Sequence, residues 1–465
     1  MFEFDIDNSD YKKVFFIGIG GISMSALAEL MLSKGYEVYG SDRNHSINTD
    51  KLQKNGATVY FCHDRNNIKD MDLVIYTDAI SLDNVELKQA IKDKIDLVDR
   101  ASFLGAIMKN FDSSIAVSGT HGKTTTTSMI AEIIKDENSN PTIMLGGQLK
   151  DIDGNIKIGS DELFLTEACE YKANILKYFP TTAIVLNIDE DHLDFFDNIE
   201  HIIGTFKGYI DNLSDNDYAI LNADDENISQ LFPINNTNVF TFGIKNNANL
   251  MAKNITFDEE GYPSYDIFLN DKNISSAKLS VLGRHNILNS LAAIAATYIN
   301  DIPIEKIISG LKSYKGVERR LEYKGDFNGA MVMDDYAHHP TEIKSAIHAL
   351  KKSCKRNLIT VFQPHTYTRT KLLLDSFSKS FDESDVIIIT DIYAAREKDY
   401  GDIHSKTLIN AIKEHKDNAY YIETFEEIVE YLKENLKKDD VVVTMGAGDV
   451  YKIGELLLRF NNHKK

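Results

Sequence analysis

The feature that most constrains the fold is the segment SSIAVSGTHGKTTTTSMIAEII, which covers residues 113–134. Residues typical of a buried strand come first, a glycine-rich loop follows, and apolar residues then recur at helical spacing. A strand that passes through a glycine-rich loop into a helix is the local arrangement of a phosphate-binding P-loop. The segment therefore predicts an α/β domain with a phosphate site at the carboxyl ends of its strands.

The residue types of this loop suit the binding of ATP. Backbone N–H groups and the helix dipole favour an anion at a helix N-terminus. We expect Lys123 to reach the β- and γ-phosphates and the Thr124 hydroxyl to bind Mg²⁺. The candidate nucleotide-binding residues of the loop are Gly119, Thr120, His121, Gly122, Lys123, Thr124 and Thr125. Val117 occupies the first glycine position of the pattern G-x-x-x-x-G-K-S/T, so an ordinary glycine-rich turn without a ligand is the alternative.

Two acidic clusters follow predicted strands and are candidates for a magnesium site. EACE, residues 167–170, follows the strand DELFLT, and DEDHLD, residues 189–194, follows AIVLNI. Ligands bind outside the carboxyl ends of parallel strands, and Mg²⁺ prefers oxygen ligands. We therefore expect Thr124, Glu170 and His192 to gather around the ion, with Glu170 the more suitable ligand of the last two. The alternative is that these acids are solvated loop residues or helix caps.

A second glycine turn lies near the start of the chain. Residues 12–42 are predicted to form a strand, a glycine turn, a helix over residues 23–34 and a second strand. Such a turn can hold the pyrophosphate of NAD or of a UDP-sugar on the helix N-terminus. The candidate residues are Gly18, Gly20, Gly21, Ser23, Ser41 and Asp42. Since Ser23 replaces the last glycine of G-x-G-x-x-G, a packing turn without a ligand is also open.

The alternation of predicted strands and helices indicates an α/β protein of three domains. A chain of 465 residues suits this number, at roughly 100 to 200 residues per domain. We expect residues 1–112 to form a Rossmann-like domain, residues 113–321 a P-loop ATPase-like domain with a mixed sheet, and residues 322–465 a second Rossmann-like domain. Turn signals and β-alternation over residues 251–283 predict an antiparallel β layer inside the central domain.

Charge and composition argue against several classes of protein. The 51 lysines and arginines and the 71 acids give a net charge of −20, which disfavours a nucleic-acid-binding protein. A few local cations can still hold an anionic small molecule on such a chain. We expect no signal peptide and no membrane span, because the start is acidic and no run of about 18 apolar residues occurs. Three distant cysteines suit a reducing cytoplasm.

The order of eight motifs along the chain resembles the Mur ligase family. The motifs are GIGGISMSALA, GTHGKTTTT, EACE, NIDEDHLD, LGRHNILN, DDYAHHP, FQPHTYTRT and MGAGD. They span residues 18–449, so the resemblance covers nearly the whole chain. GTHGKT is shared across the family, which accounts for the missing first P-loop glycine at Val117. DDYAHHP, combined with GIGG and MSALA, points to the alanine-adding branch.

The resemblance implies three domains with separate roles. The first would bind the UDP-sugar, the second would bind ATP with two Mg²⁺ ions, and the third would complete the site and bind the amino acid. The implied activity is that of an ATP-dependent ligase, which joins L-alanine to the carboxylate of UDP-N-acetylmuramate through an acyl phosphate. Such an enzyme would serve peptidoglycan and cell-wall synthesis, and hence cell shape and division, as a cytoplasmic monomer or homodimer without nucleic-acid or membrane partners.

The resemblance also assigns roles to residues of the later motifs. Those assigned to the nucleotide are His285, Asn289, Arg319 and Asp335, with Asn289 on the adenine. Those assigned to the amino acid are Tyr336, His338, His365 and Arg369. The residues expected to carry catalysis are Lys123, Glu170, His192, His338 and Arg369. The Arg369 guanidinium would clamp the alanine carboxylate, although a surface salt bridge is the simpler alternative. The residues before Pro340 could also simply cap the helix that begins there.

Three details depart from the family pattern. Many relatives carry an arginine where this chain has Thr366, which leaves the second contact to the alanine carboxylate without an assigned residue. EACE replaces the commoner EADE and places Cys169 beside Glu170, where we expect the thiol to be a packed residue. Some members use a carbamylated lysine at the metal site, and this sequence offers no assignable equivalent.

Three other functions compete with this ligase. A relative that attaches a whole recycled peptide to the same sugar nucleotide would share most of the motifs. An NAD-dependent dehydrogenase would use Gly18, Gly20 and Asp42, but it would leave Lys123 and the acidic clusters without a role. A regulatory P-loop protein would turn over ATP without any acceptor.

Overall fold

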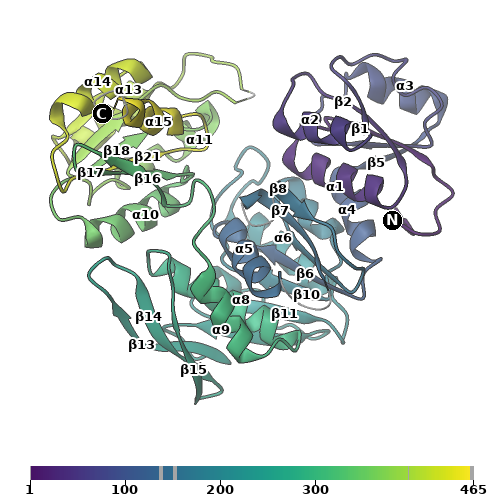
Figure 1. The fold of residues 1–465 in the computed structure, drawn as a ribbon, viewed down its shortest axis with the longest axis horizontal. Helices are drawn as coiled ribbons and strands as arrows, with labels where there is room; N and C mark the ends of the chain where they lie inside the picture. Colours follow the sequence, from purple (N-terminus) through teal and green to yellow (C-terminus); the bar gives the residue numbers. More distant parts are fainter. Residues whose placement is uncertain (1, 136–139, 150–153, 396, 461–465) are drawn as a thin grey trace. The chain divides into compact units, whose positions relative to one another are not determined.

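The computed structural model describes residues 2–135, 140–149, 154–395 and 397–460 (Figure 1). These residues cluster into two compact units. The first comprises the chain through Ile188 together with Ile202–Thr241 and Ala292–Ile302. The second comprises Asp189–His201, Phe242–Leu291 and the chain from Pro303 onward. Residues of the predicted central domain therefore contribute to both units.

The N-terminal sheet of the first unit is parallel throughout and has the order β3-β2-β1-β4-β5. Its strands are β1 (Lys13–Ile17), β2 (Glu37–Ser41), β3 (Thr58–Tyr60), β4 (Leu73–Tyr76) and β5 (Asp96–Asp99). Its helices are α1 (Ile22–Ser33), α2 (Ile47–Lys54), α3 (Val85–Asp93) and α4 (Arg100–Met108). The middle strand β1 is a continuous apolar run that is buried, as a parallel strand covered on both faces should be. The doubly wound arrangement predicted for this domain is confirmed.

The central sheet of the first unit has the order β12-β11-β10-β6-β9-β7-β8. Its strands are β6 (Ser113–Ser118), β7 (Thr142–Leu149), β8 (Gly154–Lys157), β9 (Leu163–Glu167), β10 (Thr182–Val185), β11 (Tyr218–Asn222) and β12 (Asn238–Gly243). The pairs from β11 to β7 are parallel, and the edge strand β8 is antiparallel, so the sheet is mixed as predicted. The helices of this part of the chain are α5 (Lys123–Ile134), the 3₁₀ helix η2 (Tyr171–Lys177), α6 (Ile199–Asp211), α7 (Glu226–Ser229) and α8 (His285–Ile299).

The second unit contains the antiparallel layer that the sequence predicted. Its strands are β13 (Leu250–Phe257), β14 (Pro263–Leu269) and β15 (Lys272–Lys278). Strand β13 pairs with Phe242 and Gly243 at the end of β12, and α9 (Ile304–Ser313) packs against β15.

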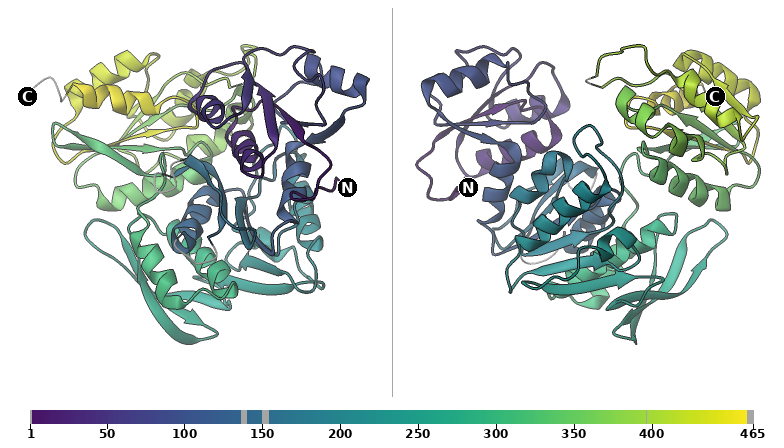
Figure 2. Two further views of the ribbon diagram at one scale, coloured as in Figure 1. Left: turned by 45° about the vertical axis from the view of Figure 1, so that its right-hand side comes forward. Right: turned by 180° about the vertical axis from the view of Figure 1, so that it is seen from behind.

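The C-terminal sheet of the second unit has the order β16-β17-β21-β18-β19-β20. Its strands are β16 (Glu322–Phe327), β17 (Ala330–Asp335), β18 (Leu358–Phe362), β19 (Val386–Ile389), β20 (Ala419–Tyr421) and β21 (Val441–Met445). Its helices are α10 (Pro340–Ser353), α11 (Tyr367–Leu372), α12 (Leu374–Ser378), α13 (Ser405–Lys413), α14 (Phe425–Asn435) and α15 (Tyr451–Arg459). Two apolar clusters, one with α10, α12 and α13 and one with α14 and α15, bury opposite faces of the sheet (Figure 2).

Five strands were not recognised in the sequence. Strand β3 is one edge of the N-terminal sheet, β7 and β8 lie at one edge of the central sheet, and β16 and β20 are the two edges of the C-terminal sheet. Edge strands are half exposed, so their apolar alternation is weak; β16, for example, reads EYKGDF. The α/β fold class is confirmed, whereas the domain limits at residues 112 and 321 stay predictions. No helix in the described part of the chain is long and apolar enough to cross a membrane.

Candidate active site

The predicted phosphate loop connects β6 to α5 with the expected backbone geometry. Gly119 and Gly122 have φ angles of +129° and +85°, a left-handed region that favours glycine. Lys123 is the first residue of α5, Thr124 and Thr125 follow in its first turn, and Gly122 is its N-cap. Within the described residues, α5 has neither a side-chain cap nor an acidic residue in its first turn. The start of this helix therefore offers a favourable field to an anion.

Asn187, which follows β10, holds the loop in place. Its side-chain oxygen accepts a hydrogen bond from the His121 N–H at 2.8 Å, and its amide donates to the His121 carbonyl at 3.0 Å. Its own carbonyl accepts from the Thr120 N–H at 3.2 Å. Sequence reasoning included Asn187 in the motif NIDEDHLD without giving it a role. The structure identifies it as a positioning residue of the loop.

The ammonium of Lys123 is bound within the loop and by Glu170. Its Nζ donates to the carbonyl oxygens of Gly119 at 2.5 Å and Thr120 at 3.1 Å. It also lies 3.1 and 3.2 Å from the two carboxylate oxygens of Glu170, which is only 2% exposed. Burial opposes the charge of Lys123, but the Glu170 carboxylate outweighs it and raises the pKa of this lysine. The two residues form a buried charge pair where the phosphates of a nucleotide are expected.

The residues predicted to hold Mg²⁺ divide between the two units. Thr124 and Glu170 lie in the first, and Lys123 connects them because it precedes Thr124 and pairs with Glu170. A hydroxyl and a carboxylate are oxygen donors of the kind that Mg²⁺ prefers, so these two residues fit the ion. His192 lies in the second unit with a left-handed φ of +55°, and its Nε2 is 3.9 Å from the Asp191 carboxylate.

Arg369 is the centre of the predicted amino-acid site in the second unit. Its Nε and Nη2 donate to Oδ1 of Asp191 at 3.2 and 2.8 Å, and its Nη1 lies 3.2 Å from Nδ1 of His365. Asp191 is buried, and although burial alone would raise its pKa, His192 and Arg369 together lower it. Sequence reasoning missed Asp191 because its neighbour His192 was taken as the functional member of the motif.

Thr366 has a local role at the start of the helix that carries Arg369. Its side chain accepts from the N–H of Arg369 at 3.4 Å, which makes Thr366 the N-cap of α11. The Thr370 hydroxyl donates to its carbonyl at 2.7 Å. The threonine therefore fixes the start of the short helix that carries Arg369, although its φ of +67° is unfavourable for a β-branched residue.

Aromatic rings gather beside Arg369. The rings of His338 and His365 meet edge to face at 5.7 Å, and Tyr393 stacks on His365 at the same distance. Tyr336 meets His338 edge to face at 5.5 Å. Burial, aided by the positive charge of Arg369, lowers the pKa of His338 to about 4. The imidazole is therefore neutral near pH 7. His339, not His338, caps α10 ahead of Pro340.

Arg319 and Asp335, two of the predicted nucleotide residues, are held by contacts with other residues of the second unit. Arg319 donates to Asp334 at 3.1 Å and to the Gly446 carbonyl at 2.6 Å, and it lies over the rings of Tyr336 and Tyr451. Asp335 accepts the N–H groups of residues 321 and 337, both at 2.7 Å. Burial raises the pKa of Asp335 to about 6.

His285 and Asn289 lie in the first turns of α8. Asn289 is buried, and its amide donates to the side-chain oxygen of Asn286 at 2.9 Å. Burial, followed by the positive charge of Arg320, lowers the pKa of His285 to about 4. This histidine is a neutral group in the folded protein.

Because His285 is neutral in the folded protein, we expect the stability of the fold to fall as the pH is lowered. Its pKa rises from about 4 to 6.5 on unfolding, so the unfolded state binds more protons between these pH values. The neutral His285 contributes fully to the free energy of unfolding above pH 6.5, and this contribution is lost as the pH falls towards 4. Between pH 7 and pH 5, the free energy of unfolding of His285→Gln should therefore fall by about 1 to 2 kcal/mol less than that of the wild type. Urea unfolding at both pH values measures this difference, and equal losses would contradict a neutral His285.

The glycine turn of the N-terminal sheet lies between β1 and α1. Asp42 accepts a hydrogen bond from the Gly20 N–H at 2.9 Å, and the Ser41 carbonyl accepts from the Gly18 N–H at 2.8 Å. The Ser41 side chain is fully buried and donates to Glu86 at 2.6 Å. Asp42 and Ser41 thus support the turn in this structure, while Gly21 is exposed on it and Ser23 begins α1 with Ile22.

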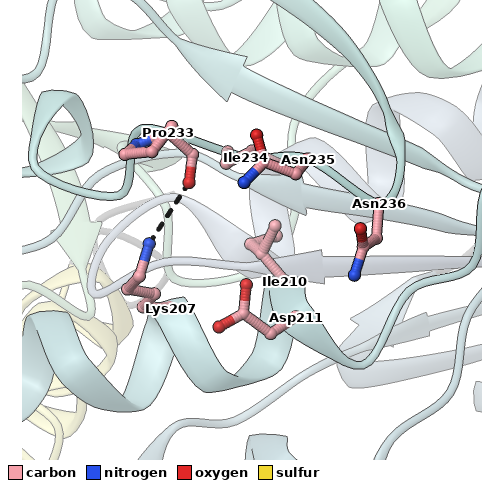
Figure 3. Close-up of a pocket in the computed structure, with 7 residues that line it drawn as sticks. All are labelled: Lys207, Ile210, Asp211, Pro233, Ile234, Asn235 and Asn236. Carbon is pink, nitrogen blue, oxygen red and sulfur yellow. Dashed lines mark hydrogen bonds between the residues drawn. The ribbon is translucent and has the colours of Figure 1, made fainter.

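A pocket of about 370 Å³ is lined by none of these residues (Figure 3). It is lined by Lys207, Ile210, Asp211, Pro233, Ile234, Asn235 and Asn236. The Lys207 ammonium donates to the carbonyls of Leu231 at 2.9 Å and Pro233 at 3.4 Å. This lysine therefore connects α6 to the loop between α7 and β12, and none of the lining residues is a predicted site residue.

Three domain families match successive parts of the chain. They are described as Mur ligase family, catalytic domain, over residues 13–112; Mur ligase middle domain, over residues 117–297; and Mur ligase, glutamate ligase domain, over residues 319–448.

Relatives with established names match along the full length. A UDP-N-acetylmuramate–L-alanine ligase of Clostridium perfringens is 48% identical over 456 residues, which are 98% of this chain and 100% of that protein. The crystal structure of a UDP-N-acetylmuramate-alanine ligase from Thermotoga maritima is 27% identical, with a TM-score of 0.80 and coverage of 97% and 100% of the two chains. A murein peptide ligase from Psychrobacter arcticus is 24% identical and shares the fold, with a TM-score of 0.71. The match covers 96% of this chain and 98% of that one.

Proposed function

The chain belongs to the Mur ligase family, and we propose on that premise that it joins L-alanine to UDP-N-acetylmuramate at the expense of ATP. The products are UDP-N-acetylmuramoyl-L-alanine, ADP and phosphate, and the reaction supplies a peptidoglycan precursor. The observation that carries the proposal is the full-length similarity to a ligase of this name. The charged P-loop site, with Lys123 and Glu170 in contact, supports it.

The reaction needs an activated carboxylate, because a free carboxylate has no adequate leaving group. In the first step a muramate carboxylate oxygen attacks the γ-phosphorus of ATP, the bond to the β-phosphate oxygen breaks, and ADP leaves. In the second step the alanine amine attacks the carbonyl carbon of the acyl phosphate, and phosphate leaves from the tetrahedral intermediate as the amine loses protons. Both steps depend on positioning and charge neutralisation more than on a protein nucleophile.

We assign the first step to the loop before α5. The backbone N–H groups of this loop bind the phosphates of ATP, and Lys123 neutralises charge on the transferred group. When ATP binds, the ammonium exchanges part of its contact with the loop carbonyls and Glu170 for phosphate oxygens. Thr124 and Glu170 would hold Mg²⁺, which would supply further positive charge at the phosphates. We propose that His192 contributes to a second ion.

We assign recognition of alanine to Arg369 and the rings beside it. Asp191 contacts the Nε–Nη2 edge of the guanidinium, and Nδ1 of His365 lies 3.2 Å from Nη1, so a substrate carboxylate at the Nη1–Nη2 edge would share Nη1 with His365 or replace that contact. Asp191 thereby fixes the orientation of the clamp. His338, neutral near pH 7, can accept a hydrogen bond from the alanine amine.

We propose that the enzyme works in the cytoplasm, as a monomer or homodimer, and that its product supports cell shape and division. Cys62, Cys169 and Cys354 are free cysteines, which suits a reducing compartment. The pKa of the Cys169 thiol is raised by burial, so this residue beside Glu170 is not a thiolate nucleophile.

Phosphate release that depends on the acceptor tests the function. With UDP-N-acetylmuramate, ATP and Mg²⁺ present, we expect L-alanine to stimulate release and a tripeptide to leave it near the acceptor-free rate. Stimulation by the tripeptide alone would contradict the assignment in favour of the peptide-attaching relative. Release that ignores every acceptor would indicate a regulatory ATPase, and binding of NADH without binding of a UDP-sugar would indicate a dehydrogenase.

A further inference from the structure

The imidazole of His338 has one bound ring nitrogen and one open ring nitrogen. Nδ1 lies 3.0 Å from the backbone carbonyl oxygen of Tyr336. Since a carbonyl can only accept, Nδ1 carries the proton of the neutral ring, and Nε2 is left as an acceptor. Among the described residues, no group forms a hydrogen bond with Nε2. An imidazole that is only 18% exposed and keeps an open acceptor nitrogen suits proton transfer from a substrate.

Glu342 lies against the Nδ1 side of this ring. Its Oε2 is 3.4 Å from Nδ1 of His338 and accepts the His338 N–H at 3.1 Å. Its Oε1 is 3.6 Å from Nη1 of Arg320, so the carboxylate is held from both sides. Burial lowers the pKa of His338, and Glu342 is the strongest influence in the opposite direction. The carboxylate therefore favours a positive charge on the imidazole and fixes the ring from the side of its protonated nitrogen.

The other groups that face His338 belong to the amino-acid site. After burial and Glu342, Arg369 on α11 lowers the pKa of His338, and Asp191 raises it. Asp191 is itself bound to Arg369 at 2.8 Å, and the rings of His365 and Tyr336 meet His338 edge to face. A carboxylate that binds Arg369 reduces the positive charge that opposes protonation of His338. Binding of the amino acid thus makes the imidazole a better proton acceptor.

The simplest role of Glu342 is that of a helix cap. It is the third residue of α10, and its Oε2 accepts the His339 N–H at 3.4 Å in a capping box. A capping box needs an acceptor oxygen at this position, which glutamine supplies as well as glutamate. It does not need a negative charge beside the His338 imidazole. Exchange of Glu342 for glutamine therefore separates the two roles. The candidate set from the sequence lacked Glu342, because a glutamate in the first turn of a helix is ordinary.

We infer that Glu342 is a positioning residue for the amide-forming step, which holds His338 so that its Nε2 accepts a proton from the bound amino acid. The inference rests on the proposed function, because it takes L-alanine as the nucleophile. The proton passes from the alanine ammonium to Nε2, and the freed lone pair forms the bond to the carbonyl carbon of the acyl phosphate. Phosphate leaves with the electrons of the broken C–O bond. Glu342 compensates the imidazolium until its proton is released to solvent.

The kinetics of Glu342→Gln test the inference. The kcat for alanine-dependent phosphate release should fall about 10- to 100-fold, with the KM for ATP changed by no more than a few-fold. Hydroxylamine is a weakly basic amine that is unprotonated near neutral pH, so it needs no proton acceptor. It should still capture the acyl phosphate as a hydroxamate at the wild-type rate. Glu383→Gln is the matched control and should keep wild-type kinetics, because Glu383 also pairs with a histidine of α10, His348 at 2.9 Å, but on the exposed surface.

A double-mutant cycle with His338→Ala shows whether Glu342 acts through the imidazole. In the His338→Ala background, Glu342→Gln should change kcat by less than about 2-fold. An equal loss in both backgrounds, or a wild-type kcat in Glu342→Gln, would overturn the inference and leave Glu342 as a helix cap. Equal losses of alanine ligation and hydroxamate formation would also overturn it, since the first step would then be impaired. A wild-type protein whose phosphate release ignores alanine would contradict the proposed function, and the inference with it.

Discussion

Lys123→Ala is expected to lower kcat for alanine-dependent phosphate release by about 100- to 1,000-fold or more, the range for losing one preorganised charge-stabilising donor. The ammonium is the cation that the loop places at the nucleotide phosphates, and charge neutralisation dominates phosphoryl transfer. The substitution also leaves Glu170, which is 2% exposed, without its ionic partner. Steady-state phosphate release with all three substrates measures the loss.

The matched control for Lys123 is Lys135→Ala. Lys135 follows the same helix and pairs with Glu132 at 2.8 Å, away from the phosphate loop. We expect this variant to keep the wild-type rate. The circular dichroism spectrum of Lys123→Ala should match that of the wild type, so that lost activity is not lost folding. A folded Lys123→Ala enzyme with more than about a tenth of wild-type kcat would remove the P-loop role from this lysine.

Arg369→Ala is expected to raise the KM for L-alanine about 100-fold, with the KM for ATP changed by no more than a few-fold. Truncating one partner of a buried charge pair costs more than the contact itself, since Asp191 is left buried without its guanidinium. Asp191→Asn should raise the same KM by a smaller factor, because the clamp keeps its charge but loses its fixed orientation. The KM values of all three substrates, measured separately, give the comparison.

Lys371→Ala is the matched control for Arg369. Lys371 lies two residues further along α11, is 57% exposed at its side chain and pairs with Asp402 at 2.7 Å. Surface pairs of this kind contribute about 0 to 1 kcal/mol, so the kinetics should not change. An Arg369→Ala enzyme with an unaltered KM for alanine would disprove the clamp and leave Arg369 as a structural partner of Asp191.

The elements that carry the site were predictable because their signals are local. The strand, the glycine loop and the start of α5 are contiguous in residues 113–134, and their order alone fixes a phosphate-binding geometry. The start of α10 at Pro340 was equally readable, since proline favours the first turn of a helix. Strand β16 was not, because an edge strand with one exposed face carries little apolar periodicity.

The partners inside the site could not be predicted from spacing. Lys123 and Glu170 are 47 positions apart, and Asp191 and Arg369 are 178 apart. Nothing in the sequence distinguishes an acid that binds a metal from one that orients an arginine. Asp191 shows this directly, because its motif had pointed to His192 while the guanidinium contacts the aspartate.

The sequence by itself determined the phosphate loop, the α/β class and the family, because these depend on residues that are neighbours in the chain. Tertiary structure alone decided which charges meet: Glu170 with Lys123, and Asp191 with Arg369. The physical reason is that backbone geometry follows from short-range sterics and hydrogen bonds, whereas the pairing of distant charges follows from how sheets and helices bury their apolar faces.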